Sequence, residues 1–200
     1  MKERPILFSA PMIRALLDGS KTQTRRVAKP QPSRHHWEGI PGYALNMDGP
    51  APMEGGSVGV RFNHTIPQNR EWDRDAWVKC PYGQPGDRLW VREAWMPVEH
   101  DVQPYRYRAT NPSYIGKWKP SIHMPRIASR ITLDVFSVRV ERLRDISRGD
   151  AMGEGCPFPN MAQGDDPRQW YADLWSQING PGSWELNPWV WVVEFKRIAP

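Results

Sequence analysis

The segment from residue 86 to residue 95 constrains the fold most tightly, because it alternates like a β-strand and yet carries a charge on its apolar face. Leu89, Val91, Glu93 and Trp95 would share one face of such a strand. An ionised carboxylate on a core-facing strand is costly unless a cation pairs with it or its pKa rises. Glu93 is therefore predicted to be either half of a structural ion pair or a group poised for chemistry.

Capping residues mark the ends of the predicted helices. Ser9 begins a short helix that Gly19 ends. Two later helices are predicted to start at Ser147, which has Asp150 three residues further on, and at Asp166, which is followed by a proline. Few other segments have helical periodicity, so helices are a minority of the predicted structure.

Apolar alternation or continuous apolarity predicts strands in the rest of the chain. The segments are residues 5–8, 105–108, 129–143 and 189–195. In the third of these the apolar face changes register near Phe136, which predicts a β-bulge. The last is apolar at nearly every position, as expected of a strand covered on both faces. Several non-adjacent strands with few helices favour an α+β fold, namely a small mixed β-barrel with helices packed outside.

Residues 30–79 are a different kind of sequence. Pro and Gly recur there, and only residues 57–62 and 76–80 have the pattern of strands. We therefore expect one domain over residues 1–200, in which residues 30–79 form a Gly/Pro-rich insertion, a lid-like hairpin region rather than a second domain.

The charge is positive and unevenly distributed. The chain carries a formal net charge of +5, and residues 148–200 contribute seven acidic but only four basic side chains, so the excess lies in the first 147 residues. Arginine supplies most of it, and the guanidinium group suits phosphates, base edges and aromatic faces. This composition favours a nucleoside, nucleotide or RNA as partner, although a merely solvated basic surface fits equally well.

Two absences in the sequence bear on location and cofactors. No apolar run reaches the length of a membrane span, and the first residues lack the order of a signal peptide, so a cytoplasmic protein without a membrane partner is expected. Cys80 and Cys156 belong to no paired motif. No metal site, no cofactor and no obligate protein partner is predicted.

Candidate catalytic and ligand-binding residues cluster in two further segments of the sequence. Directly after the first helix, residues 20–27 bring together Lys21, Thr24, Arg25 and Arg26. The Pro-interrupted segment 118–126 is a candidate ligand-binding loop, and the side chains expected to reach a ligand from it are Ser121, His123 and Arg126.

Several of these segments resemble the conserved blocks of ASCH domains. Residues 19–26 resemble the glycine-x-lysine-threonine-x-threonine-arginine signature, and residues 85–93 resemble the second block. The likeness is to the longer ASCH-like proteins encoded by tailed phages and prophages, in which CPYG, PGDRLWVREAW, KPSIHMPR and NPWVWVVEF recur in this order. It covers roughly residues 3–30 and 80–200.

The resemblance implies a PUA-like β-barrel and a function on nucleosides or RNA. Some small ASCH proteins are amidohydrolases that remove the acetyl group from N4-acetylcytidine, and their working Lys, Thr and Glu match Lys21, Thr24 and Glu93. The resemblance thus implies a hydrolase acting on N4-acylated cytidine or a similar modified base. The alternatives are a non-catalytic RNA-binding phage regulator and a ribonuclease. The remaining residues expected to bind substrate are Arg25, Arg26, Arg92, Ser121, His123 and Arg126.

The chemistry leaves two roles open for the lysine. Thr24 would attack the acyl carbon or orient a water, and Lys21 would act as base if burial lowers its pKa, or hold the oxyanion if it stays charged. Glu93 is expected to face the cleft and touch Lys21. There its charge would keep the lysine protonated, which favours the oxyanion role, or Glu93 would accept the proton itself. Lys21 and Thr24 can share a site only if the chain between them is not a regular strand, because residues three apart on a strand face opposite sides.

Overall fold

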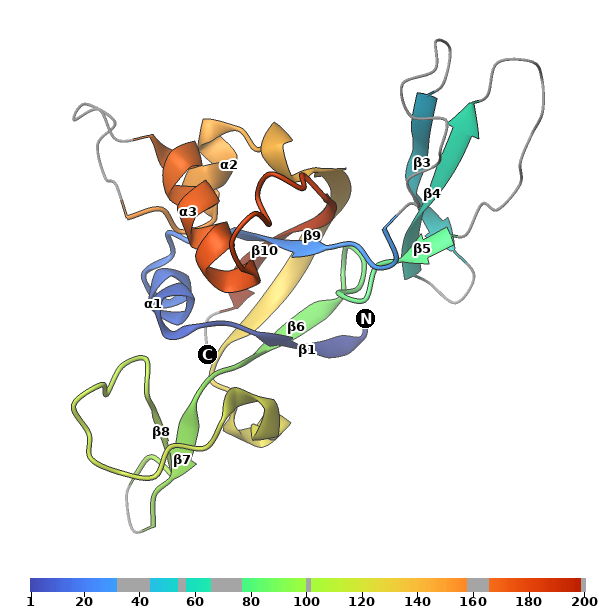
Figure 1. The fold of residues 1–200 in the computed structure, drawn as a ribbon. Helices are drawn as coiled ribbons and strands as arrows, with labels where there is room; N and C mark the ends of the chain where they lie inside the picture. Colours follow the sequence, from blue (N-terminus) through green and yellow to red (C-terminus); the bar gives the residue numbers. More distant parts are fainter. Residues whose placement is uncertain (32–43, 54–56, 66–76, 100–101, 158–165, 199–200) are drawn as a thin grey trace.

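The computed structural model describes residues 1–31, 44–53, 57–65, 77–99, 102–157 and 166–198. Its largest element is a five-stranded sheet in the order β1-β6-β9-β10-β2 (Figure 1). β1 pairs with β6 in parallel, and the other neighbours are antiparallel. The strands are β1 (Glu3–Leu7), β2 (Gln23–Val27), β6 (Arg88–Arg92), β9 (Thr132–Arg142) and β10 (Trp189–Ile198).

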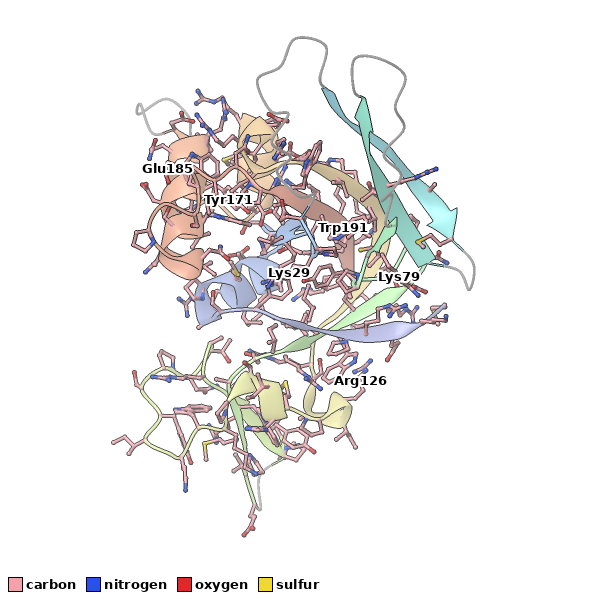
Figure 2. All side chains as sticks on the ribbon, turned by 45° about the vertical axis from the view of Figure 1, so that its right-hand side comes forward. Lys29, Lys79, Arg126, Tyr171, Glu185 and Trp191 are labelled. Atoms are coloured by element: carbon pink, nitrogen blue, oxygen red, sulfur yellow. The ribbon has the colours of Figure 1, made fainter. Side chains whose placement is uncertain are left out.

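Both faces of β10 are buried, as its continuous apolarity predicts. Trp191, Val193 and Phe195 belong to the larger core cluster, together with residues of β1, β6 and β9. Val190 and Val192 point to the opposite side and pack with residues of α3 (Pro167–Asn179). Figure 2 shows the two layers through Trp191 in the sheet and Tyr171 on the side of α3.

The helices begin where their capping residues predict. α1 (Ala10–Asp18) follows Ser9, and Gly19 ends it at a φ of 85°. In α2 (Arg148–Gly153) the side chain of Ser147 and the carboxylate of Asp150 form a complete capping box. Asp166 caps α3 by accepting a hydrogen bond from the Arg168 amide. Side-chain capping bonds therefore hold the starts of α2 and α3, whereas Ser9 precedes α1 without such a bond.

The expected bulge in β9 is confirmed. Glu194 pairs with Ser137 and Phe195 pairs with Val135, so Phe136 has no partner across the strands. The extra residue lets Val135 and Val138 both face the core although they are an odd number of positions apart.

The insertion forms a small antiparallel sheet of β3 (Ala44–Met53), β4 (Ser57–Thr65) and β5 (Trp77–Lys79). The two segments with strand character fall in β4 and β5. Val58, Val60 and Val78 are buried and belong to the same core cluster as the main sheet. Apolar side chains thus anchor this sheet to the main core.

The segment 86–95 is not one strand but two, which corrects the expectation. β6 ends at Arg92, and β7 (Trp95–Pro97) pairs with β8 (Tyr105–Tyr107) in a separate two-stranded sheet. At the break the Glu93 amide donates to Met124 Sδ at 3.4 Å instead of to a neighbouring strand. The chain then passes through two 3₁₀ turns, η1 (Ser121–His123) and η2 (Arg126–Ala128). A third, η3 (Leu143–Asp145), follows β9.

The architecture is α+β, and none of the sheets in the described residues closes into a barrel. β1 and β2 are the two edges of the main sheet. Arg26 of β2 nevertheless reaches β1, because its Nη2 donates to the Leu7 carbonyl oxygen at 2.6 Å. No helix in the described part of the chain is long and apolar enough to cross a membrane.

Two substitutions in β9 test this account of the core. Leu133 is fully buried at the centre of the sheet, whereas Phe136 at the bulge is 57% exposed. We expect Leu133→Ala to lower the free energy of unfolding by about 2–4 kcal/mol because it leaves a cavity. Phe136→Ala is expected to cost less than about 1 kcal/mol. Urea unfolding measures both, and equal losses would contradict the assignment of faces.

Candidate active site

Lys21 is a buried amine that pairs with one carboxylate among the described residues. Its Nζ lies 2.7 Å from Glu154 Oε2 and donates also to the Glu154 carbonyl oxygen at 2.9 Å. Nζ also lies 5.7 Å from the centre of the Phe8 ring. Burial lowers the pKa of Lys21, and the charge and hydrogen bond of Glu154 oppose part of that effect. The lysine therefore releases its proton more readily than an exposed lysine does.

The backbone around Lys21 departs from a regular strand. β2 begins only at Gln23, and Lys21 forms an isolated bridge with Glu154, which directly follows α2. Because Lys21 lies outside β2, the alternation of strand faces does not apply between Lys21 and Thr24. Gly155 makes the close approach possible, since a Cβ there would lie 2.9 Å from the Ala15 Cβ and 3.3 Å from the Lys21 Cβ.

Arg25 connects Glu154 to two further carboxylates. Its Nη1 lies 3.3 Å from Glu154 Oε1, its Nε donates to Glu141 Oε1 at 3.0 Å, and its Nη2 lies 3.3 Å from Asp150 Oδ2. The Arg25 side chain has no exposed surface. Glu154 consequently gives one oxygen to Lys21 and the other to Arg25, so the carboxylate has a fixed orientation.

Asp150 joins the capping box of α2 to this network. Burial raises its pKa, but hydrogen bonds from Ser147 and Gln23 and the charges of Arg25 and Arg139 outweigh burial and lower the pKa to about 2. Arg139 is in turn paired with Glu141 and Glu194. The same carboxylate that caps the helix preceding Glu154 therefore also holds Arg25.

Thr24 lies at a small pocket along the free edge of β2. The pocket has a volume of about 60 Å³ and lies between β2, α1 and α3. Its polar lining residues include Thr24, Arg25, Arg26, Glu154 and Tyr171. A volume of this size is below that of a typical ligand pocket, so it fits a small planar group rather than a whole nucleoside. Burial and the charge of Glu154 raise the pKa of Tyr171, which keeps its hydroxyl protonated.

Two lining residues carry buried donors that lack an acceptor. Among the described residues no carboxylate pairs with Arg26, whose Cζ lies 5.3 Å from the centre of the Phe8 ring. Its Nε is buried without a hydrogen-bond partner, and so is Nε1 of Trp175 on α3. An acceptor oxygen bound in the pocket would satisfy these two donors.

Glu93 has a different partner from the one expected. It is buried and accepts two hydrogen bonds from Arg130, at 2.9 and 3.0 Å. Burial raises the pKa of Glu93, and Arg130 opposes that shift. The expected contact between Glu93 and Lys21 is wrong, because Lys21 pairs with Glu154 and Glu93 pairs with Arg130. In the sheet, β9 and β10 lie between β6 and β2.

The other predicted residues lie on the Glu93 side or close to it. Arg92 stacks on Trp90, with its Cζ 4.6 Å from the ring centre. Ser121 is half-buried and His123 exposed in η1, and Arg126 pairs with Glu3 at 2.8 Å. None of these four lines the pocket at Thr24.

Arg126 instead lines a second cavity on that side of the molecule. Its volume is about 340 Å³, and Arg88 and Arg130 line it as well. The predicted residues therefore divide into two groups: Lys21, Thr24, Arg25 and Arg26 lie in or beside the small pocket, and the rest lie around Glu93 or this cavity.

Sequence reasoning missed Glu154, Tyr171 and Trp175. The one local signal for Glu154 is its position between two glycines after a capped helix, where Gly155 has a φ of 94°. Among the described residues, no group of His, Cys, Asp and Glu is arranged to hold a metal ion.

Comparisons with protein-family models, with curated proteins and with solved structures gave no match.

The Glu93–Arg130 pair yields a stability prediction. We expect Glu93→Gln to lower the free energy of unfolding by about 1–3 kcal/mol, because Arg130 loses its counter-ion in a largely buried position. The matched control is Asp134→Asn, since Asp134 is 53% exposed and pairs with Arg88 at 2.9 Å. Asp134→Asn should lower the free energy of unfolding by less than about 1 kcal/mol. Urea unfolding compares the two variants, and an equal effect would contradict a structural role for Glu93.

Proposed function

We propose that this protein is a hydrolase of the ASCH type that removes the acyl group from an N4-acylated cytidine or a similar modified base. The observation that carries the proposal is the buried Lys21 amine, bonded to Glu154 at the wall of the Thr24 pocket. A buried lysine with a lowered pKa is a suitable general base, and a threonine hydroxyl is a suitable nucleophile. The resemblance of residues 19–26 to the ASCH signature supports the same assignment.

The proposed fold is the PUA-like barrel of that family. The contact from Arg26 of β2 to the Leu7 carbonyl of β1 supports it, because this contact spans the two edge strands of the main sheet. Helix α1, which connects these two strands in sequence, packs against the same core cluster.

In the proposed reaction, Thr24 Oγ1 attacks the acyl carbon and its proton moves to Lys21 Nζ. The carbonyl oxygen becomes an oxyanion, which the guanidinium of Arg26 is suited to stabilise because no carboxylate pairs with it among the described residues. The C–N bond then breaks, and Lys21 returns the proton to the departing amine. Water hydrolyses the resulting threonine ester. The small pocket admits the acyl group and the amide edge, while the sugar remains outside.

Glu154 acts as a positioning residue in this scheme. Both of its carboxylate oxygens already contact cations, Lys21 and Arg25. It therefore orients the lysine amine rather than attacking the substrate itself. The carboxylate next to Lys21 is therefore that of Glu154, not that of Glu93.

Substitutions that keep the shape of the site test the proposal. We expect Lys21→Met and Thr24→Val each to reduce kcat/KM for N4-acetylcytidine by about 100-fold or more, since each removes a group that takes part in bond making or proton transfer. The rate is measured by chromatographic detection of the released cytidine. Lys196→Met at an exposed position of β10 is the control and should retain full activity. Wild-type protein that binds RNA but releases no cytidine would favour the non-catalytic RNA-binding alternative, and cleavage of labelled RNA would favour a ribonuclease.

The pH dependence of the reaction tests the role of the lysine. If Lys21 is the base, kcat/KM rises with pH as its amine deprotonates, and the rise lies below the pH of an ordinary lysine because burial lowers this pKa. Glu154 raises the pKa of Lys21, so Glu154→Gln should move the rise to still lower pH while it lowers the maximum. A shift to higher pH, or none, would contradict Lys21 as the base.

A further inference from the structure

A thirty-residue part of the chain contains no acidic side chain. Residues 102–131, here called the basic lobe, include six basic residues and four large aromatic ones. The basic residues are Arg106, Arg108, Lys117, Lys119, Arg126 and Arg130. The aromatic residues are Tyr105, Tyr107, Tyr114 and Trp118. No acidic side chain within the lobe offsets these six positive charges, and the reaction proposed above makes no use of them.

The basic lobe has a small core of its own and lies away from the Thr24 pocket. Trp95, Met124 and Ala128 are buried together, with Tyr105 and Tyr107 packed against them. Figure 1 shows β7, β8 and the chain that follows at the lower end of the sheet, apart from α2 and α3. A ligand on this lobe would therefore occupy a surface distinct from the pocket.

Three of its cations are not neutralised locally. Arg108, Lys117 and Lys119 are exposed, and in the described ranges no carboxylate lies within ion-pair distance of any of them. Lys119 lies with its Nζ 5.1 Å from the ring centre of Trp95. Unpaired surface cations of one sign create a field that attracts polyanions.

Aromatic rings lie among these cations. The rings of Tyr114 and Trp118 meet edge to face at 6.2 Å between centres, and Arg106 Cζ lies 4.9 Å from the centre of the Tyr114 ring. Tyr114 is 39% exposed. Gly116 permits this turn, because a Cβ there would lie 2.9 Å from both Met96 Sδ and the Tyr114 ring. Arginine and aromatic side chains arranged together form the usual platform on which unpaired bases stack.

We propose that the basic lobe binds single-stranded nucleic acid, with phosphates at Arg108, Lys117 and Lys119 and a base stacked at Tyr114 and Trp118. An anionic membrane surface is the competing partner, because Ile115 and Ile122 are also exposed. The helical segments of the lobe are three-residue 3₁₀ turns, and among the described residues of the lobe there is no amphipathic helix to lie in a membrane interface, which favours nucleic acid. The inference does not depend on the hydrolase reaction.

Fluorescence anisotropy tests whether the lobe binds single strands. The full chain is titrated into a short labelled oligouridylate, the matching oligothymidylate and a duplex of the same length. Single strands should bind more tightly than the duplex, and the two single strands show whether RNA is preferred. Lys117→Ala combined with Lys119→Ala should weaken binding about tenfold or more and make the salt dependence shallower by about 1.4 in log–log slope. Tyr114→Ala should weaken binding about tenfold without changing that slope.

Two controls separate this proposal from the hydrolase. Lys196→Ala combined with Arg197→Ala removes two exposed cations from β10 and should leave oligonucleotide affinity unchanged. The lobe variants should retain full turnover of free N4-acetylcytidine, and Thr24→Val should retain oligonucleotide affinity. Absence of single-strand binding, equal losses in the β10 control, or binding only to vesicles containing an anionic phospholipid would overturn the proposal.

Discussion

The carboxylate of Glu154, held between two buried cations, is the interaction on which the arrangement around the pocket depends. Lys21 and Arg25 have essentially no exposed side-chain surface, and either charge would be costly without a partner. Glu154 satisfies both because the capping box begins α2 at Ser147, the helix ends at Gly153 directly before Glu154, and Gly155 allows the chain to approach Lys21 closely. The short helix α2 thus leads directly into Glu154, and its own Asp150 also contacts Arg25.

A second buried carboxylate serves the opposite end of the sheet in a different way. Both oxygens of Glu93 are bonded to the single guanidinium of Arg130, whose Cζ also lies 4.0 Å from the Tyr107 ring centre. The pair joins the end of β6 to the basic lobe at the break between β6 and β7. Glu154 is shared by two cations beside a pocket, whereas Glu93 is satisfied by one. The first arrangement suits proton transfer, and the second suits rigidity.

Local patterns in the sequence predicted the elements well, because the physics that determines them is local. The register change near Phe136, the capping box of Ser147 and the apolar run of β10 each follow from neighbouring residues. The partner of Lys21 did not follow, since Glu154 is 133 positions away and Glu93 has the same charge in a segment with a clearer strand pattern. Periodicity indicates that a carboxylate is buried, but it does not indicate which cation lies beside it. The end of β6 at Arg92 was missed for the same reason, because Glu93 turns toward Arg130 and Met124 only once the chain is folded.

The protonation of Lys21 depends on how the other cation is held. The positive charge of Arg25 itself lowers the pKa of Lys21, and Arg25 also takes one oxygen of the Glu154 that raises it. Glu141 and Asp150 in turn hold Arg25, and Asp150 does so as an ion even in moderately acidic solution because its pKa is about 2. If those two carboxylates were absent, Arg25 would rely on Glu154 alone and Lys21 would have less of its counter-ion. The acidic side chains of β9 and α2 thus influence the pKa of Lys21 through Arg25, and the proposed role of Lys21 as general base depends on that pKa.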